Sequence, residues 1–391
     1  MRNFQIANIC VLAAMLLAAC TLPDAAELSD ADFPLVTPTP FPAATTETKE
    51  TPRPTLVIRQ TSDATATPMM AHWTHVGMPT GAEKAFQILV HPEDDTLWYV
   101  LGHQGDANLS TSLFISEDAG ATWKIVYTGK IMRPLTIDPQ DGNILYSADD
   151  AKLIRSTDRG QTWSVIHDFD DLLESIHIST IDRAIYVGLG WYNSTNPGLY
   201  RSDDDGESWK FLSFGAAIQN FLPWDIEEDP NTGYLYVVIE IADHPQPYDP
   251  PFYRSTDRGE TWEEVGGDLT WHGFSIQVNP LNSDVYFLSE GAGLFKSTDE
   301  GLSWNRINDQ VNFARELVID PKKPARFIGV DIYHQPLYDG GVYYSENYGK
   351  SFLFLGLEGQ NTADLALNSS STMMYVVSYD QGIYTSPIPA P

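Results

Sequence analysis

The sequence predicts an all-β fold, a seven-bladed β-propeller built from four-stranded antiparallel blades. Three observations predict it. A turn motif, Ser-x-Asp-x-Gly-x-x-Trp, occurs five times and once more in degenerate form. A short strand ending in the serine of this motif occurs seven times, at spacings of 40 to 53 residues, which suits one blade per repeat. Aromatic residues make up 12% of the chain, as expected for a fold made of strands.

The seven short strands are expected to be the third strands of the blades. They cover residues 112–116, 152–156, 198–202, 251–255, 293–297, 341–345 and 382–386. Alternating segments lie upstream and usually end at a proline, as at 87–92, 135–139, 275–280 and 317–321. Second strands follow these, as at 97–101, 144–146, 234–239 and 374–378. Each repeat therefore reads as four strands, with the turn motif joining the third strand to the fourth.

The turn motif has the chemistry of a hairpin. Its acidic side chain accepts backbone N–H bonds within the turn, its glycine supplies a positive φ, and its tryptophan packs into the core as the next strand starts. We therefore expect a structural role for every copy, including the degenerate one, where Phe352 replaces the tryptophan. The turn residues are Asp118, Asp158, Asp204, Asp257, Asp299 and Asn347.

The seventh repeat stops after its third strand, so its fourth strand must come from elsewhere. Trp73-Thr74-His75-Val76 resembles the fourth strand that starts at Trp123. We expect residues 72–77 to join the last blade and close the ring, which removes two exposed sheet edges. A six-bladed ring with a stray terminal hairpin is the alternative.

The start of the chain has the pattern of an export signal followed by a tether. An apolar run ends in Leu-Ala-Ala-Cys20, which resembles the lipobox of bacterial lipoproteins. The resemblance implies cleavage before Cys20 and lipidation of its thiol, and an ordinary secretory signal is the alternative. Between Thr37 and Pro68, sixteen of 32 residues are Thr or Pro, a composition that does not build a core. The expected domains are a signal peptide at 1–19, a disordered tether at 20–71 and a propeller at 72–391.

Composition excludes several classes of function. The formal net charge of −30 disfavours binding to nucleic acid. Two cysteines rule out a disulfide scaffold or a thiolate zinc site, and the nine histidines show no spacing typical of metal ligands. We therefore expect no metal and no cofactor.

The repeats resemble the Asp-box (BNR) repeats of sialidases, sortilin-type receptors, xyloglucanase-type glycosidases and photosystem II assembly factors. The resemblance covers roughly residues 72–386 and implies the propeller fold, but these families differ in function. It also implies that the Asp-box turns lie on the face away from most binding sites. We therefore expect a ligand on the opposite face.

Loops on that opposite face are uneven, and several carry aromatic side chains. Aromatic rings beside short polar groups suit a glycan or a protein segment. The alternative is that these loops only pack against one another. Together with residues at the starts of the inner strands, the candidate ligand-binding side chains are Trp191, Tyr192, Trp224, Tyr248, His272, Tyr333 and Tyr338.

Two arginines, Arg133 and Arg315, lie at equivalent starts of inner strands and complete the predicted ligand site. They could clamp a carboxylate through paired hydrogen bonds. The alternative is that each pairs with an acid at the same level, namely Glu174, Glu316 or Asp364. By contrast, Arg155, Arg201 and Arg254 precede motif serines, and we expect them on the surface.

The predicted function is that of a monomeric, membrane-anchored binding or scaffold domain outside the cytoplasm. Sialidases carry an Arg-Ile-Pro element and an arginine triad, whereas this sequence has no Arg-Ile-Pro and only two well-placed arginines, and this argues against that chemistry. A glycoside hydrolase using Glu174 and Asp364 as its acid and base stays open as an alternative. An assembly factor for a membrane complex is the third possibility.

Overall fold

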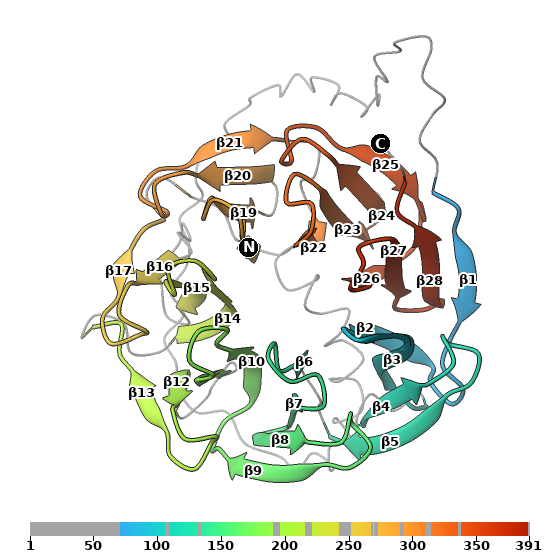
Figure 1. Ribbon diagram of the computed structural model, residues 1–391, viewed down its shortest axis with the longest axis horizontal. Coiled ribbons are helices and arrows are strands. Elements are labelled where there is room, and N and C mark those ends of the chain that lie inside the picture. The colour runs from blue at the N-terminus through green and yellow to red at the C-terminus, as the bar shows by residue number, and fades with distance from the viewer. Residues whose placement is uncertain are drawn as a thin grey trace, which may run out of the picture. The chain divides into compact units, whose positions relative to one another are not determined.

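A computed structural model describes residues 71–105, 110–130, 134–190, 196–215, 221–241, 252–266, 269, 273–289, 293–309, 314–334 and 338–389. In these residues the strands form seven four-stranded antiparallel sheets around a central axis (Figure 1). The prediction of an all-β, seven-bladed propeller is thereby confirmed. No helix in the described part of the chain has the length and apolar character needed to cross a membrane.

Each blade extends from an inner first strand to an outer fourth strand. Blade 1 contains β2 (Lys84–His91), β3 (Asp94–His103), β4 (Thr111–Ser116) and β5 (Lys124–Gly129). Blade 2 contains β6 (Leu135–Ile137), β7 (Leu145–Asp149), β8 (Lys152–Ser156) and β9 (Ser164–Asp168). Blade 3 contains β10 (Leu173–Ile178), β11 (Ile185–Leu189), β12 (Gly198–Ser202) and β13 (Lys210–Leu212).

The remaining blades follow the same order. Blade 4 contains β14 (Phe221–Glu228), β15 (Leu235–Ile241), β16 (Phe252–Ser255) and β17 (Glu263–Glu264). Blade 5 contains β18 (Gly273–Val278), β19 (Val285–Ser289), β20 (Gly293–Ser297) and β21 (Asn305–Asn308). Blade 6 contains β22 (Ala314–Ile319), β23 (Phe327–His334), β24 (Tyr338–Ser345) and β25 (Leu353–Gly356). Blade 7 contains β26 (Thr362–Leu367), β27 (Met373–Ser378), β28 (Gly382–Pro387) and β1 (Thr74–Gly77).

Blade 7 combines the two ends of the described chain. Strand β1 runs antiparallel to β28, with Thr74 opposite Thr385. The backbone N–H of His72 donates to Ser386 Oγ at 3.0 Å, as a motif glycine N–H does to its serine in the other blades. The indole of Trp73 donates to the Leu355 carbonyl of blade 6 at 2.8 Å. The predicted closure is confirmed, and the six-bladed alternative is excluded.

The Asp-box turns have the predicted hydrogen bonds. In blade 1, Asp118 Oδ1 accepts from Thr122 N and Ser116 Oγ, each at 2.8 Å. The two residues that follow have left-handed backbones, with φ of 56° at Ala119 and 85° at Gly120. In the degenerate turn, Asn347 still accepts the N–H of Ser351 at 3.0 Å. The turn therefore survives replacement of its carboxylate by an amide, as the sequence predicts.

Neighbouring blades are joined by buried side chains. Each hydrophobic cluster combines residues of adjacent blades, and tyrosines on the second strands fill these seams. The hydroxyl of Tyr186 in blade 3 donates to the Arg258 carbonyl in the turn of blade 4. Five such tyrosines are at most 2% exposed, namely Tyr99, Tyr146, Tyr186, Tyr236 and Tyr286.

Two arginines predicted to lie on the surface are buried in these seams. Arg201 is 8% exposed and donates to the Arg258 carbonyl of the next blade at 2.9 Å. Arg254 is 6% exposed and donates to the Glu300 carbonyl of the next blade at 2.9 Å. The surface prediction is wrong for both, because their acceptors lie in a different repeat. Arg155 is half-buried.

Candidate ligand-binding face

The two faces of the ring differ in what they carry. Because the strands of a blade alternate in direction, the turns from first to second strand and the Asp-box turns share one side, the Asp-box face. The loops from second to third strand and the connections between blades share the other side, the loop face. The predicted ligand residues belong to the loop face and to the inner strands that start there.

Part of the predicted site can be located. Five of its residues lie outside the described residues, namely Arg133, Trp191, Tyr192, Tyr248 and His272. The backbone of blade 6 places Tyr333 opposite Asp339 and Tyr338 opposite His334, where β23 and β24 meet the loop face. Arg315 lies on the inner strand β22. Trp224 lies on the inner strand β14 and is half-buried.

Inner strands carry a β-bulge at the same place in six blades. The ladder between first and second strand skips one residue, and the residue before Ser175 or Asp225 is an example. A bulge bends the strand and re-aims a side chain, and it recurs next to binding sites. The skipped residues are Phe86, Glu174, Trp224, Phe274, Arg315 and Ala363. Aligning the starts of the first strands in the sequence grouped Glu174, Trp224 and Arg315 together, and the structure places all three at the bulge.

In four of the six blades with a bulge, the residue after the bulge forms a hydrogen bond to the next blade, here called a clasp. The inner strand has no further strand on its axial side, so its axial N–H groups need other acceptors. Asp225 Oδ2 accepts the N–H of Ile276 in blade 5 at 2.9 Å. Gln87 accepts the N–H of Leu135 in blade 2 at 2.9 Å and donates to its carbonyl at 3.0 Å. The polar residues after the bulges therefore stabilise the ring.

Asp364, a predicted catalytic candidate, is one of these clasp residues. Its Oδ2 accepts the N–H of Ile88 in blade 1 at 2.8 Å, and its Oδ1 accepts the N–H of Leu365 at 2.8 Å. This bonding gives Asp364 a structural role at the closure of the ring. The other candidate, Glu174, is half-buried on β10 in blade 3, which is not a neighbour of blade 7.

An acidic cluster on β14 was missed by the sequence reasoning. Burial raises the pKa of Asp225 to about 6. Burial, with the charge of Asp225, raises the pKa of Glu227 to about 8. Burial acts in the same direction on Glu228, but the His177 imidazole 3.8 Å away and hydrogen bonds from Ser179 and Thr180 outweigh it and lower that pKa to about 2. The acidic run Glu227-Glu228-Asp229, where β14 ends, was the available signal.

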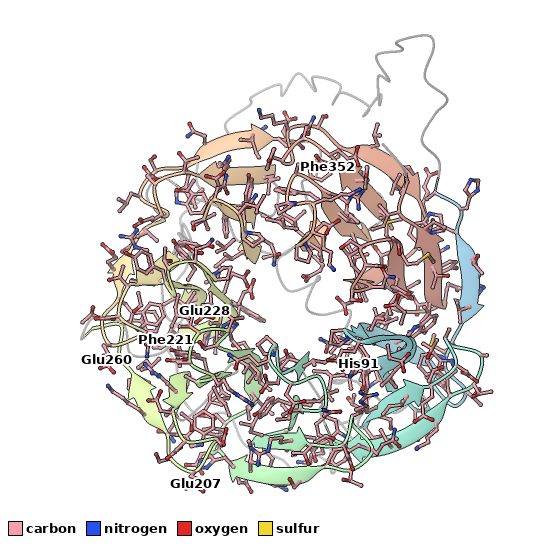
Figure 2. The ribbon with its side chains drawn as sticks, in the orientation of Figure 1. His91, Glu207, Phe221, Glu228, Glu260 and Phe352 are labelled. Carbon is pink, nitrogen blue, oxygen red and sulfur yellow. The ribbon has the colours of Figure 1, made fainter. Side chains whose placement is uncertain are left out.

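The bonding of Glu228 explains its low pKa. Glu228 is 7% exposed, and its side chain reaches back to blade 3, where its oxygens accept hydrogen bonds from Ser179 Oγ and Thr180 N, each at 2.7 Å. Figure 2 shows Glu228 on its inner strand, together with His91 on β2. His91 Nε2 lies 3.0 Å from the Gly142 carbonyl of blade 2. These inner-strand groups hold blades together.

A lysine at the start of blade 1 is also paired across the closure. Lys84 Nζ lies 2.7 Å from Asp380 Oδ1 of blade 7 and 4.6 Å from the ring centre of Tyr379. The described residues contain no group of three or more His, Cys, Asp or Glu side chains placed to hold a metal ion.

The fold and the repeated turn define the class: this chain is an Asp-box repeat β-propeller. Residues 251–385 match the family described as Sortilin, neurotensin receptor 3 (Sortilin-Vps10). The matched segment covers blades 5 and 6 and parts of blades 4 and 7, and it includes two complete Asp-box turns and the degenerate one.

Sequence relatives are xyloglucanases. Xyloglucanase Xgh74A of Acetivibrio thermocellus is 29% identical over 131 residues, which cover 29% of this chain and 15% of that protein. A probable oligoxyloglucan-reducing end-specific xyloglucanase of Neosartorya fischeri is 25% identical over 191 residues, covering 46% and 23%. The chain thus spans less than a quarter of the length of these relatives.

Similar solved structures share the fold. YCF48 from Cyanidioschyzon merolae superposes with a TM-score of 0.58 at 13% identity, covering 81% of this chain and 98% of that one. The GH74 enzyme of Niastella koreensis gives a TM-score of 0.51 at 16% identity, with coverages of 78% and 66%. The extracellular domain of BT4673 from B. thetaiotaomicron gives 0.59 at 14% identity, with coverages of 82% and 40%.

Proposed function

We propose that the chain is a lipid-anchored lipoprotein outside the cytoplasm, whose monomeric propeller binds a glycan on its loop face. The observation that carries this proposal is the division between the two faces. On the Asp-box face, the same hydrogen-bonded turn repeats from blade to blade with its polar groups satisfied internally. On the loop face, loop length and side chains change from blade to blade, as expected where a ligand sets the sequence.

A glycan is favoured over a protein segment by the sequence relatives, which are named xyloglucanases. The aromatic residues in the sequence of the loop face also suit this class of ligand, because aromatic rings pack against the apolar faces of sugar rings. If the propeller binds a protein segment and no glycan, the protein segment replaces the glycan as the ligand.

The bonding of Asp364 supports binding over hydrolysis. Both of its oxygens accept backbone N–H groups, so a role as acid or base would compete with a clasp of the ring. The similarity to xyloglucanases keeps a glycoside hydrolase as the second candidate. Release of reducing sugar from xyloglucan by the purified chain, lost in Glu174→Gln, would establish that candidate in place of ours.

A glycan and peptide array probed with the purified full chain tests the proposal. We expect binding to glycans, weakened by Trp191→Ala, Tyr248→Ala or Tyr338→Ala on the loop face. Binding to peptides alone, or co-purification with a membrane complex and no glycan binding, would contradict it.

The anchor has a separate test. The wild-type chain should fractionate with membranes and incorporate a labelled fatty acid, whereas Cys20→Ser should do neither. Equal fractionation of both forms would show that Cys20 is not the anchor.

A further inference from the structure

The outer strand of blade 3 carries an exposed aromatic ring. Among the phenylalanine, tyrosine and tryptophan residues of the described ranges, two are exposed, Phe211 on β13 and Tyr348 in the degenerate Asp-box turn. Phe211 is 44% exposed and Tyr348 is 38% exposed. Lys296 Nζ lies 6.0 Å from the centre of the Tyr348 ring, so a cation accompanies that ring. Phe211 therefore has the largest exposed fraction of any aromatic side chain in the described part of the chain.

The Phe211 ring is held in place by its neighbours. Phe211 pairs with Tyr200 on β12, and the centres of the two rings lie 5.3 Å apart at an interplanar angle of 65°. The ring also covers the backbone of Gly198, where a Cβ atom would meet Phe211 Cε2 at 2.5 Å. The hydroxyl of Tyr200 donates to the Asn196 carbonyl at 3.3 Å, which fixes the supporting ring in turn. One side of Phe211 is thus packed, and the exposed remainder is held in a defined position.

This ring lies at the outer edge of the loop face. Strand β12 starts at Gly198, directly after the loop from the second to the third strand of blade 3, so the Phe211 ring lies beside the loop-face end of β12. Figure 1 shows β13 on the outside of the ring of blades. Tyr200 also contacts Phe169, which follows β9 of blade 2, at a centre-to-centre distance of 6.0 Å. The aromatic contacts therefore join blades 2 and 3 at this edge.

Strand β13 leaves backbone polar groups beside the ring. It is the fourth strand of its blade, so alternate residues direct their N–H and C=O groups out of the sheet. The fourth strands of blades 1, 2, 5, 6 and 7 are bulged, whereas the ladder between β12 and β13 is regular. With three residues, β13 is too short for a peptide strand to add many main-chain hydrogen bonds. This edge suits a compact ligand rich in hydroxyl groups better than an extended peptide.

The charges close to this edge are negative. Burial raises the pKa of Tyr200, and the carboxylates of Asp171 and Asp170 act in the same direction, so both acids lie near its hydroxyl. Asp170 is exposed and Asp171 is half-buried. Lys210 on β13 has its ammonium group 2.5 Å from a carboxylate oxygen of Glu260 in blade 4, so its charge is matched there. Carboxylates accept hydrogen bonds from sugar hydroxyls and repel acidic sugars.

We propose that Phe211 is the stacking platform of a subsite for a neutral sugar ring at the outer edge of the loop face. This inference rests on the proposed glycan-binding function and names its ligand class. The exposed side of the Phe211 ring offers an apolar plane for the C–H face of a sugar. Asp170 and the free edge of β13 offer acceptors and donors for the hydroxyl groups of the same sugar.

Calorimetric titration of the full chain in detergent tests the subsite. Cellohexaose and xyloglucan heptasaccharide are the neutral probes, trigalacturonate is the acidic probe and pentalysine is the cationic probe. Phe211→Leu removes the aromatic plane and keeps an apolar side chain, so it should weaken binding of a neutral probe about threefold to tenfold. Phe211→Tyr keeps an aromatic plane and should retain most of the affinity.

Ile125 provides a matched control on the outer strand of blade 1. It pairs with Phe114 across β4 and β5, as Phe211 pairs with Tyr200, and it is 43% exposed. Ile125→Ala removes an equally exposed apolar side chain from the equivalent position and should leave the sugar affinity unchanged. The unfolding midpoint of every variant is measured beside its affinity.

Hydrogen exchange of the wild-type chain decides the question if Phe211→Leu does not fold. A neutral probe should protect backbone N–H groups at 210–213 on β13 and leave those at 124–127 on β5 unchanged. Equal exchange at 210–213 with and without a bound neutral probe would overturn the subsite.

The outcomes separate this inference from the proposed function. A wild-type chain that binds neutral sugars, with Phe211→Leu binding them equally well, would overturn the subsite only. Binding of trigalacturonate that Phe211→Leu weakens, without binding of the neutral probes, would overturn the neutral class and leave glycan binding in place. If the chain binds no glycan on the array, both fail, and pentalysine binding weakened by Phe211→Leu would then make a cationic peptide the ligand of this ring.

Discussion

Two adjacent glutamates on opposite sides of strand β14 have pKa values that are shifted in opposite directions. Glu227 points toward blade 5, where the nearest backbone donor, Val278 N, lies 3.5 Å from Oε1. Glu228 points toward blade 3, where three donor groups lie within 2.7 Å of its oxygens. The pKa rises to about 8 at Glu227 and falls to about 2 at Glu228, although the two residues are adjacent.

The difference shows that burial alone does not set the pKa of an acid in this ring. What decides it is the number of donors that the neighbouring blade supplies. The same rule explains the Asp-box turns, where Asp118, Asp158, Asp204 and Asp299 have lowered pKa values because turn hydroxyls and N–H groups bond to them. Much of the net charge of −30 therefore sits on carboxylates that stabilise turns and seams.

Removing the charge of Glu228 should have the largest effect on stability. A pKa of about 2 against the usual 4.5 corresponds to about 3 kcal/mol of stabilisation at pH 7. This stabilisation is present above pH 4.5 and is lost as the pH falls toward 2. Glu228→Gln should lower the free energy of unfolding at pH 7 by about 2–3 kcal/mol in urea titrations. A change near zero would mean that the blade 3 donors do not stabilise the charge.

The substitution Glu227→Gln should change the stability in the opposite direction. The raised pKa of Glu227 means that the folded chain holds this proton more tightly than the unfolded chain. The contribution of Glu227 to the free energy of unfolding is most favourable below pH 4.5 and is lost as the pH rises toward 8. At pH 7 this loss amounts to about 3 kcal/mol. Glu227→Gln should therefore stabilise the chain at pH 8 and flatten the decline in unfolding midpoint between pH 5 and 8. A variant less stable than wild type at pH 8 would contradict this account.

The Asp-box turn should give a smaller effect with its own internal control. Asp158→Ala removes the acceptor for Thr162 N and Ser156 Oγ, and it should cost about 1–2 kcal/mol. Asp158→Asn keeps an acceptor oxygen, as Asn347 does in the sixth turn, and should cost less than half as much. Equal losses in the two variants, measured by thermal unfolding, would show that charge and not geometry stabilises the turn.

Sequence alone was sufficient for features that repeat within one blade. The Asp-box turns and the missing fourth strand of blade 7 could be predicted because each depends on local spacing, and Trp73 could be matched to Trp123. Contacts between blades were harder to predict. The buried Arg201, for example, donates a hydrogen bond to the carbonyl of Arg258, which is 57 residues away in the next repeat.

The inner strands show the same limit on a finer scale. Alignment of strand starts brought Glu174, Trp224 and Arg315 to one position, but it treated Asp364 as equivalent to Glu174. The bulge shifts the register by one residue, so Asp364 matches Ser175 and Asp225 and clasps the next blade. No sequence pattern marks a bulge, because its signature is a backbone pairing and not a residue type.

The central claim is that the loop face binds the ligand and the Asp-box face only holds the ring together. Hydrogen exchange of the full chain, with and without a bound oligosaccharide, tests it most directly. The account predicts new protection at the loop-face starts of the inner strands, around 173–176 and 221–226, and none at the Asp-box turns. Protection of the turns at 116–123 or 156–163, with the inner-strand starts unchanged, would contradict it.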